Sequence, residues 1–492
     1  MPQRIEGRRA RVALAAALML ALSACAQFER QGQVSGPASP PHRARPGAPR
    51  IDPRTLIQHK ELVAQFGGEY QAPAAARHLD SILARIAAAS ETPGQQAYRV
   101  TVLNTPVVNA FALPSGNIYV TRGLLALAND SSEVAAVMAH EISHVTAHHS
   151  ALRDEREKVA AVISQAATVM QSKQKGEEIR STQRLSVASF SRQQELDADA
   201  MGVRAIARAG FDPYGAARFL NALGKSTELR ESLYGKKKST AGFDILSTHP
   251  STPDRVAKAV AAARQIGAPG VGARDREGYL AAVNGVAFGD DPNDGFVRGR
   301  KFVHPRLRFA FTAPENFLLE NSSEAVFGIR DDTKEALHLD DVRPPAFGTL
   351  ETYAQSGWVD GLLPSSVKRI DVNGMPAVTA AARAGEWNFE VAVIQNGDDI
   401  YRLIYAVRAI NEETEKRFSA MLQSFHRLSP EEASAVRGLR LAVATAGPED
   451  TPATMAAHMV TPNRPLEYFL LLNGLDESAT LTAGEKYKII VE

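Results

Sequence analysis

The sequence predicts a multidomain chain: a large, mainly α-helical α+β domain, then a small α+β domain, then a short strand–helix–helix–strand module. Three observations predict this fold class. The chain has 492 residues, 44% of them hydrophobic, which suffices for about three cores at roughly 150 residues per domain. Two segments rich in Gly and in Pro or Asp interrupt the apolar pattern. Helical spacing of apolar residues dominates before residue 266, and strand-like runs dominate after residue 306.

These composition shifts divide the chain into consecutive segments. The order is an export signal (1–25), a flexible tether (26–53), the large domain (54–265), a linker (266–300), the accessory α+β domain (301–430) and the C-terminal module (437–492).

The N-terminal segment has the pattern of a bacterial export signal. Arginines precede an apolar run from Val12 to Leu22, and small residues lead to Cys25. The run falls short of the ~20 residues that span a bilayer, so a transmembrane anchor is not expected. The segment resembles the lipobox of bacterial lipoproteins, which implies a lipid on Cys25. Residue 26 is Ala rather than Asp, which by the same resemblance favours the outer membrane. The alternative is a plain signal peptide that is cleaved nearby.

The pentapeptide HEISH, which begins at His140, is the most informative motif. On a helix, His140 and His144 lie on one face, so both imidazoles can bind one Zn²⁺ while Glu141 reaches the metal-bound water. Asp130 and Glu133 have the spacing of a capping box that starts this helix. The alternative is an ordinary amphipathic helix with solvated histidines in its last turn.

A third protein ligand must come from elsewhere in the chain. His148 lies about 12 Å from His140 along a straight helix, too far to share the same ion. Ala147 and Ser150 occupy the places where a metzincin has Gly and His, so that class is excluded.

A carboxylate from a second helix remains as the third ligand. Glu195 and Asp199 are four residues apart in an apolar helix that ends near Gly210. Glu195 would bind the metal, and Asp199 would orient a ligand histidine through its free ring N–H. Two alternatives stay open: a solvated acidic helix face, or Glu177 or Glu178 as the ligand.

The HEISH motif, the later segment ELDADAMG (195–202) and the segment AGFDP (209–213) together resemble a known family. They are similar to the gluzincin metallopeptidases of the CAAX prenyl protease, HtpX and periplasmic β-barrel-assembly-enhancing protease type. The resemblance covers about residues 56–262. It implies a zincin fold, one zinc ion on His140, His144 and Glu195, and Glu141 as the general base.

The same resemblance gives a role to residues 109–120, which the pattern predicts as a β-hairpin with a Pro-Ser-Gly turn. Family members place a strand, turn and strand just before the metal helix. If the first strand is a sheet edge, its backbone at Asn109, Ala110 and Phe111 can pair with an extended substrate. The alternative is a pair of buried strands without a binding role.

A further family-like element is His249-Pro250 followed by Arg255. In relatives this segment lies near the metal. His249 would either donate to the oxyanion that develops during hydrolysis or occupy the fourth zinc position in a resting state. The alternative is a helix-start turn, with Arg255 as a surface charge.

The C-terminal module resembles LysM, the βααβ fold that binds peptidoglycan. It has the LNGL sequence at 472–475, but Glu449 stands where LysM usually has Gly. Glycan binding and a role in packing alone therefore both stay open. The accessory domain carries no chemical motif and is interpreted as an interaction or positioning module.

Together these inferences favour a lipid-anchored zinc metalloendopeptidase on the periplasmic face of a bacterial envelope. Its expected substrates are unfolded or misassembled envelope proteins, cleaved by a zinc-bound water that Glu141 activates. A net charge of +1 gives no indication of the basic surface that nucleic-acid binding requires. The only cysteine, Cys25, lies far from any base that a cysteine protease would need. The alternatives are a non-catalytic chaperone or scaffold at the cell wall, and a peptidoglycan hydrolase.

Overall fold

The computed structural model describes residues 53–90, 97–149, 190–234, 245, 249, 252–322, 325–330, 334–343, 348–461 and 464–492. The export signal with Cys25, nearly all of the tether, and the alternative ligands Glu177 and Glu178 lie outside these described residues. Within the described ranges, no helix combines the length and the apolar character that crossing a membrane requires.

A three-stranded sheet lies next to the helix that carries the HEISH motif. Its order is β1-β3-β2: β1 (Arg99–Leu103) runs parallel to β3 (Asn117–Thr121), and β2 (Ala110–Ala112) pairs antiparallel with β3. Strand β2 is therefore an edge of this sheet. Alternate side chains of β3 face opposite sides, so Ile118 and Val120 join the main core while Tyr119 joins a smaller cluster.

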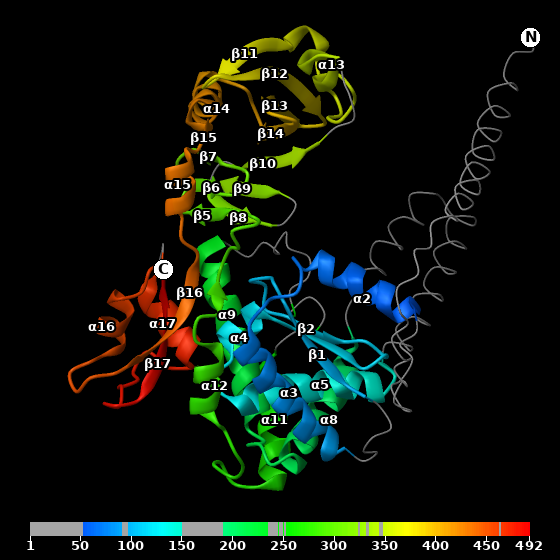
Figure 1. Cartoon of the computed structure of the whole chain (residues 1–492), viewed down its shortest axis with the longest axis vertical. Helices are drawn as coiled ribbons and strands as arrows, with labels where there is room; N and C mark the ends of the chain where they lie inside the picture. Colours follow the sequence, from blue (N-terminus) through cyan, green and yellow to red (C-terminus); the bar gives the residue numbers. More distant parts are fainter. Residues whose placement is uncertain are drawn as a thin grey trace, which may run out of the picture. The chain divides into compact units, whose positions relative to one another are not determined.

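Helices cover both faces of this sheet (Figure 1). Helices α3 (Pro73–Ala88) and α5 (Ser131–Thr146) pack on the side of Ile118 and Val120. Helix α2 (Pro53–Gln65) packs on the other side, where His59 Nδ1 and the Tyr119 hydroxyl are hydrogen-bonded at 2.8 Å. Helix α5, which carries the HEISH motif, is thus fixed against the face of the sheet that carries Ile118 and Val120.

Helix α5 begins where the sequence predicts it. The Asp130 side chain accepts a hydrogen bond from the Glu133 N–H at 3.0 Å. The Glu133 carboxylate accepts from the N–H of Asn129 at 2.8 Å, one residue before the N-cap. The predicted capping box is therefore present in a form shifted by one residue.

Helix α8 (Arg192–Arg208) crosses α5, and α9 (Gly215–Tyr234) and α11 (Pro253–Ile266) pack beside them. Gly202 allows the close approach of α8 to α5. A Cβ atom at this position would lie only 3.2 Å from the backbone nitrogen of His140. The glycine therefore brings the acidic helix within reach of the HEISH face.

The accessory domain is built on a seven-stranded antiparallel sheet and a four-stranded sheet. The larger sheet has the order β11 (Lys368–Val372), β12 (Met375–Ala384), β13 (Trp387–Asn396), β14 (Asp399–Val407), β10 (Glu335–Val342), β9 (Val326–Arg330), β8 (Leu318–Asn321). The smaller sheet has the order β15 (His426–Arg427), β7 (Phe309–Thr312), β6 (Lys301–His304), β5 (Phe296–Arg298).

Short helical elements accompany these sheets: α13 (Leu350–Ala354), the 3₁₀ turn Pro364–Ser366, α14 (Glu412–Ser424) and α15 (Pro430–Ala435). Phe418 and Met421 of α14 join one apolar cluster of the large sheet, and Leu350 and Ala354 of α13 join another. The predicted α+β character of this segment agrees with these elements.

The range 266–300, predicted as a linker, contains regular structure. It holds α12 (Arg276–Val283), β4 (Ala287–Phe288) and β5. Tyr279 and Val283 are buried in the main core. Gly, Asp and Arg are the most frequent residue types in this stretch, and that composition suggests a linker. The stretch is nevertheless ordered because a few large apolar side chains pack into the core.

The C-terminal segment has the predicted order of strand, helix, helix, strand. The elements are β16 (Leu439–Thr445), α16 (Pro452–Ala457), α17 (Pro465–Asn473) and β17 (Lys486–Val491). Strand β4 extends their sheet in the order β17-β16-β4. Leu441, Phe469 and Ile490 belong to the same apolar cluster as α3 and α5. The module therefore shares one core with the domain that carries the HEISH motif.

A buried lysine strengthens this junction. Lys488 of β17 is 0% exposed, and its Nζ donates to the carbonyl oxygens of Ala126 at 2.7 Å and Ala128 at 2.5 Å. These carbonyls end helix α4 (Arg122–Leu127), which directly precedes the start of α5. Burial lowers the pKa of Lys488 to about 7, although nearby Glu133 opposes the shift.

We expect Lys488→Met to lower the free energy of unfolding by about 1–3 kcal/mol, because the carbonyls of Ala126 and Ala128 would stay buried without a donor. Chemical denaturation of the protein, followed by circular dichroism, measures this change. Lys486→Met, at the exposed first position of the same strand, is the matched control. Equal unfolding midpoints for the two variants would contradict the prediction.

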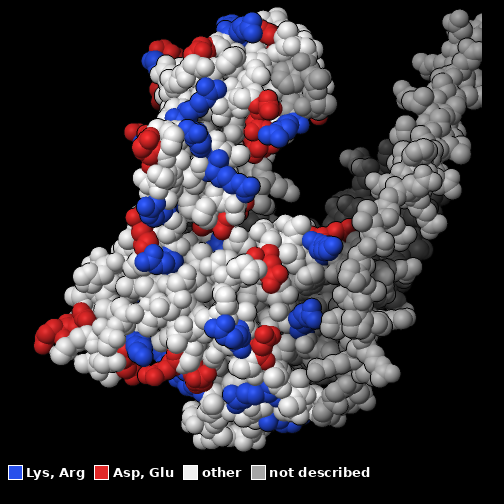
Figure 2. All heavy atoms as spheres, in the orientation of Figure 1, with Lys and Arg blue, Asp and Glu red and all other residues white. Residues whose placement is uncertain are grey.

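Charged side chains of both signs are interspersed on the face of the molecule that Figure 2 shows. Lysine and arginine do not merge there into one continuous basic surface. This distribution matches the near-zero net charge of +1, so long-range attraction of a highly charged ligand is weak on this face.

Candidate metal centre

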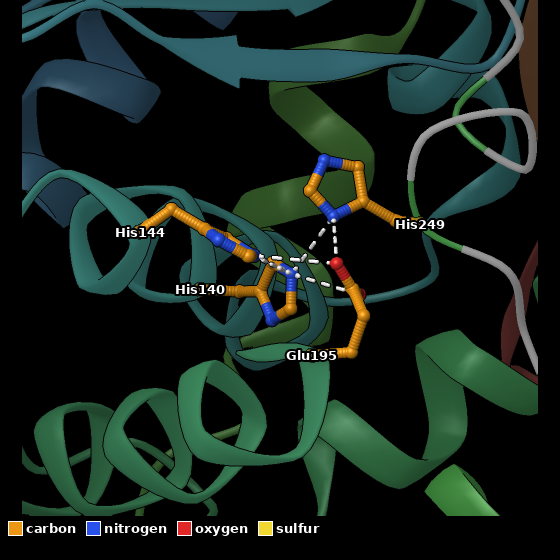
Figure 3. Close-up of side chains that lie close together, drawn as sticks. All are labelled: His140, His144, Glu195 and His249. Atoms are coloured by element: carbon orange, nitrogen blue, oxygen red, sulfur yellow. Dashed lines mark hydrogen bonds and ion pairs between the residues drawn. The ribbon is translucent and has the colours of Figure 1, made fainter. Parts of the chain in front are cut away.

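Four buried side chains converge between α5 and α8 (Figure 3). Helix α5 supplies His140 and His144, which lie one turn apart on the same face, and α8 supplies Glu195 from its first turn. His249 points toward the same place from the segment before α11. One nitrogen or oxygen atom from each of these four residues, which together form the ligand group, lies within 4.8 Å of the corresponding atoms of the other three.

The distances within this group match the spacing of metal ligands. His140 Nε2 lies 3.0 Å from His144 Nε2 and 3.2 Å from His249 Nδ1. Glu195 Oε1 lies 3.5 Å from His144 Nε2 and 2.9 Å from His249 Nδ1. Tetrahedral zinc with bonds of ~2.0–2.1 Å separates its ligand atoms by about 3.3 Å. The observed distances fall on both sides of that value.

The chemistry of this donor set also fits zinc. Three imidazole nitrogens and one carboxylate oxygen are ligands that Zn²⁺ accepts, whereas Mg²⁺ and Ca²⁺ prefer oxygen alone. Glu141, next to His140 in the motif, has a buried Oε1 that accepts no hydrogen bond from any residue that the structure describes. Burial raises the pKa of the Glu141 carboxyl to about 8, with His140 opposing the shift. The site therefore offers ligands and a base together.

Asp199 lies where the sequence predicts it, one turn beyond Glu195 on α8. Its Oδ1 is 2.9 Å from His140 Nδ1, the ring nitrogen that faces away from the ligand group. Burial alone would raise the pKa of Asp199, but Arg255 and His140 outweigh that effect and hold it well below its usual range. The resulting carboxylate lies where it can orient the His140 ring.

Arg255 is a buried partner of both acids on α8. It donates to Asp199 through Nε and Nη2, each at 2.8 Å, and its Nη1 lies 2.8 Å from Glu195 Oε2. Only 4% of the residue is exposed, so the interpretation of Arg255 as a surface charge is wrong. The predicted helix start is present as well, because Thr252 caps α11. Both features coexist, since the cap places Arg255 in the first turn facing α8.

His149 is a neighbour of the site to which the sequence pattern assigns no role. Its Nδ1 lies 3.0 Å from Nδ1 of His144, and the residue is buried. A straight helix would carry His149 away from His144, but the chain turns at His148, whose φ is +54°. The run of histidines after HEISH is the only sequence signal for this contact.

His249 lies inside the ligand group rather than beside it. Its Nδ1 faces Glu195 and His140, while its Nε2 is 3.8 Å from Glu141 Oε1. Its backbone N–H donates to the carbonyl of Ile245 at 2.7 Å. The sequence leaves two roles open for His249, a fourth metal ligand or a donor to the oxyanion. The contacts of Nδ1 concern the first role, and the position of Nε2 near Glu141 concerns the second.

The residues with a predicted role in substrate binding lie on or next to edge strand β2. Ala110 and Phe111 lie opposite Val120 and Tyr119 of β3, so one edge of this strand is paired. Asn109 precedes them and is hydrogen-bonded to Thr121. The backbone N–H of the next residue of β2, Ala112, lies near enough to the Glu141 carboxyl to lower its pKa slightly, against the larger effect of burial. Edge strand β2 therefore runs beside the part of α5 that carries Glu141.

Comparison with known proteins identifies this part of the chain. Residues 73–263 match the model of peptidase family M48. These residues form an M48 peptidase domain. The predicted gluzincin resemblance is thereby confirmed, and zinc is the cofactor of this M48 domain. The lipoprotein signal and the LysM-like module lie outside the matched residues and stay predictions.

Curated relatives match the same region. The β-barrel assembly-enhancing protease of Escherichia coli is 32% identical over 190 residues, which cover 37% of this chain and 37% of the relative. The mitochondrial metalloendopeptidase OMA1 of Arabidopsis thaliana is 34% identical over 160 residues, covering 32% of this chain and 30% of the relative. OMA1 of Schizosaccharomyces pombe is 30% identical over 210 residues, which cover 41% of this chain and 57% of the relative. The chain thus spans little more than a third of the length of the first relative, so the likeness concerns the M48 domain.

Proposed function

We propose that the chain is a zinc metalloendopeptidase that hydrolyses peptide bonds of unfolded or misassembled proteins in a bacterial envelope. One observation carries the proposal: the buried Oε1 of Glu141, which accepts no hydrogen bond from the residues that the structure describes, lies beside His140, His144 and Glu195. A carboxylate in that place can accept the proton of a water molecule that is activated at the ligand group.

Each residue of the site then has a chemical task. Zinc, when bound, lowers the pKa of water and polarises the scissile carbonyl. Glu141 takes the proton of the attacking water and returns it to the leaving amine. Asp199 keeps the Nδ1 proton of His140 in place, which leaves Nε2 as the ligand atom. Arg255 holds Asp199 and Glu195 at a fixed separation.

Strand β2 supports an unfolded substrate. Because β2 is a sheet edge that passes Glu141 at Ala112, an extended chain could pair with the backbone near Asn109, Ala110 and Phe111. Such pairing uses main-chain groups and is nearly independent of sequence. Only a segment without its own tertiary structure can adopt that conformation, so folded proteins would be poor substrates.

The position of His249 favours its role as a resting-state ligand over its role as an oxyanion donor. Its Nδ1 is 2.9 Å from Glu195 Oε1 and 3.2 Å from His140 Nε2, within the spacing expected of two ligands on one ion. A fourth protein ligand excludes the attacking water. Hydrolysis therefore requires His249 to leave the group.

The envelope location rests on the N-terminal pattern and on the printed name of the E. coli relative. The pattern that ends at Cys25 implies a lipid anchor on the periplasmic face, with the outer membrane favoured. The relative is called a β-barrel assembly-enhancing protease, which supports envelope proteins as substrates and protein quality control as the task.

The contacts of the LNGL sequence support a packing role for the C-terminal module over glycan binding. Asn473 holds the backbone of Lys488 through both of its side-chain atoms. A Cβ atom on Gly474 would lie 3.2 Å from Asn129 Nδ2 of the M48 domain. The motif thus faces the peptidase.

Removal of the metal tests the proposed function. We expect the mature chain to cleave a small disulfide-bonded protein only after its reduction and unfolding. Dialysis against EDTA should abolish this cleavage, and one equivalent of Zn²⁺ should restore it. Gel analysis of the digest and metal analysis of the protein provide the readouts.

Two outcomes would instead support the alternatives. Release of muropeptides from peptidoglycan without proteolysis would favour the hydrolase. Suppression of aggregation that is equal in the zinc-loaded and metal-free chains, without any cleavage, would favour the chaperone or scaffold.

A further inference from the structure

The imidazole of His144 has a neighbour at each of its two ring nitrogens. Its Nε2 faces the ligand group, 3.0 Å from His140 Nε2 and 3.5 Å from Glu195 Oε1. Its Nδ1 faces the other way and lies 3.0 Å from Nδ1 of His149. Both histidines are buried, with His149 only 5% exposed. His149 therefore contacts a ligand histidine in the protein interior, on the side of the ring that faces away from the metal.

The backbone turns so that this contact can form. Helix α5 ends at Thr146, and His148 has a left-handed conformation with a φ of +54°. On a continued helix only residues three or four positions apart are neighbours, so a residue five positions after His144 would leave its face. A left-handed backbone is uncommon for a residue other than glycine. The exposed His148 makes the turn, and the turn places His149 against His144.

The direction of the hydrogen bond between His144 and His149 decides whether His144 can bind zinc. Two ring nitrogens that lie 3.0 Å apart share one proton, so one ring donates and the other accepts. A neutral His144 that donates its Nδ1 proton has a free lone pair on Nε2, the atom that faces the ligand group. If His149 donated instead, the proton of a neutral His144 would be on Nε2 and would block metal binding. Zinc on His144 therefore requires His149 as the acceptor.

The two ligand histidines of α5 thus have outer partners of different chemistry. For His140 the partner at Nδ1 is the carboxylate of Asp199, at 2.9 Å. For His144 it is the neutral imidazole of His149. Such partners fix the tautomer and the ring orientation of a metal-binding histidine. Phe190 adds a second restraint on His144, because the two rings are stacked with their centroids 3.9 Å apart.

We propose that His149 is a positioning residue for zinc binding: its Nδ1 accepts the Nδ1 proton of His144 and thereby keeps Nε2 of His144 free and directed at the metal. This inference goes beyond the proposed function, because it concerns metal binding by the M48 domain and does not depend on which proteins are cleaved.

Three substitutions of His149 separate the hydrogen bond from the filling of space. His149→Asn keeps an acceptor in place, because its carbonyl oxygen is attached to Cγ, the atom that carries Nδ1 in histidine. His149→Leu has a methyl group there and cannot accept. His149→Gln carries its acceptor one carbon farther out, near the place of Nε2. We expect His149→Leu and His149→Gln to raise the zinc dissociation constant by about 10–100-fold, and His149→Asn to stay close to the wild type.

Competition for Zn²⁺ with a chromophoric chelator, starting from protein that has been dialysed against EDTA, measures these constants without any assay of proteolysis. His148→Asn is the matched control. It removes the exposed imidazole next to His149, while asparagine tolerates the left-handed conformation of the turn, so zinc binding should not change. Circular dichroism of the metal-free proteins verifies that each variant folds. If His149→Leu does not fold, the comparison between His149→Gln and His149→Asn decides.

The outcomes distinguish this inference from the proposed function. Equal zinc dissociation constants for His149→Asn and the two variants without a well-placed acceptor would overturn the role of His149, because a residue that only fills space gains nothing from an acceptor. A loss in His148→Asn as large as in His149→Leu would overturn it as well. A protein that shows the expected zinc constants and cleaves no unfolded protein would support the role of His149 and overturn the proposed function alone.

Discussion

Glu141→Gln is expected to reduce cleavage of an unfolded protein by about 10²–10⁴-fold while one zinc ion per chain stays bound. Glutamine keeps the size of the side chain but cannot accept the proton of the attacking water. His140, His144 and Glu195 are untouched, so the ligand group keeps its donors. Initial rates of proteolysis and zinc content per chain, measured on the same preparation, give both quantities.

The matched control for this experiment is Glu228→Gln. Glu228 is exposed on α9 and lies outside the site, so the same chemical change should leave both activity and zinc unaltered. Equal activity of wild type and Glu141→Gln would contradict the assignment of Glu141 as base. Loss of zinc together with activity would place Glu141 among the ligands instead.

The parts of the site that follow helical spacing could be predicted from the sequence. His140 with His144 and Glu195 with Asp199 are pairs four residues apart, and each pair occupies one face of a single helix. Such pairs can be predicted from the spacing within one helix, without knowledge of the tertiary structure. The meeting of the two helices is a tertiary event, and Gly202 permits it by leaving only hydrogen at the contact with His140.

Other features depend on contacts that local patterns do not encode. His149 reaches His144 only because His148 adopts a left-handed backbone conformation. Lys488 is fully buried, although lysine is among the residue types least often found inside proteins. Residues 266–300 form a helix and strands because Tyr279 and Val283 find partners in a core to which the distant C-terminal strands also contribute.

Arg255 illustrates the same limit with a measurable consequence. In the sequence it is one arginine near a helix start, where a surface position is a reasonable expectation. In the structure it is the cation shared by two buried carboxylates, those of Glu195 and Asp199. Removal of one member of such a buried group leaves the remaining charges uncompensated.

We therefore expect Arg255→Met to lower the free energy of unfolding of the zinc-free chain by about 3–5 kcal/mol. The loss should be smaller in the zinc-loaded chain, because the bound cation compensates the charge of Glu195. Denaturant titrations in EDTA and in excess zinc measure the two values. Lys258→Met on the same helix removes an exposed positive charge and should change either value by less than about 1 kcal/mol.

The comparison between the two conditions distinguishes an electrostatic role of Arg255 from a packing role. If Arg255 only filled space, Arg255→Met would cost little and the cost would be independent of zinc. Arg255→Lys restores the charge but cannot make the paired contacts to Asp199 and the contact to Glu195 at once. It should recover part of the stability in EDTA while proteolysis stays below wild type, because His140 depends on Asp199 for its orientation.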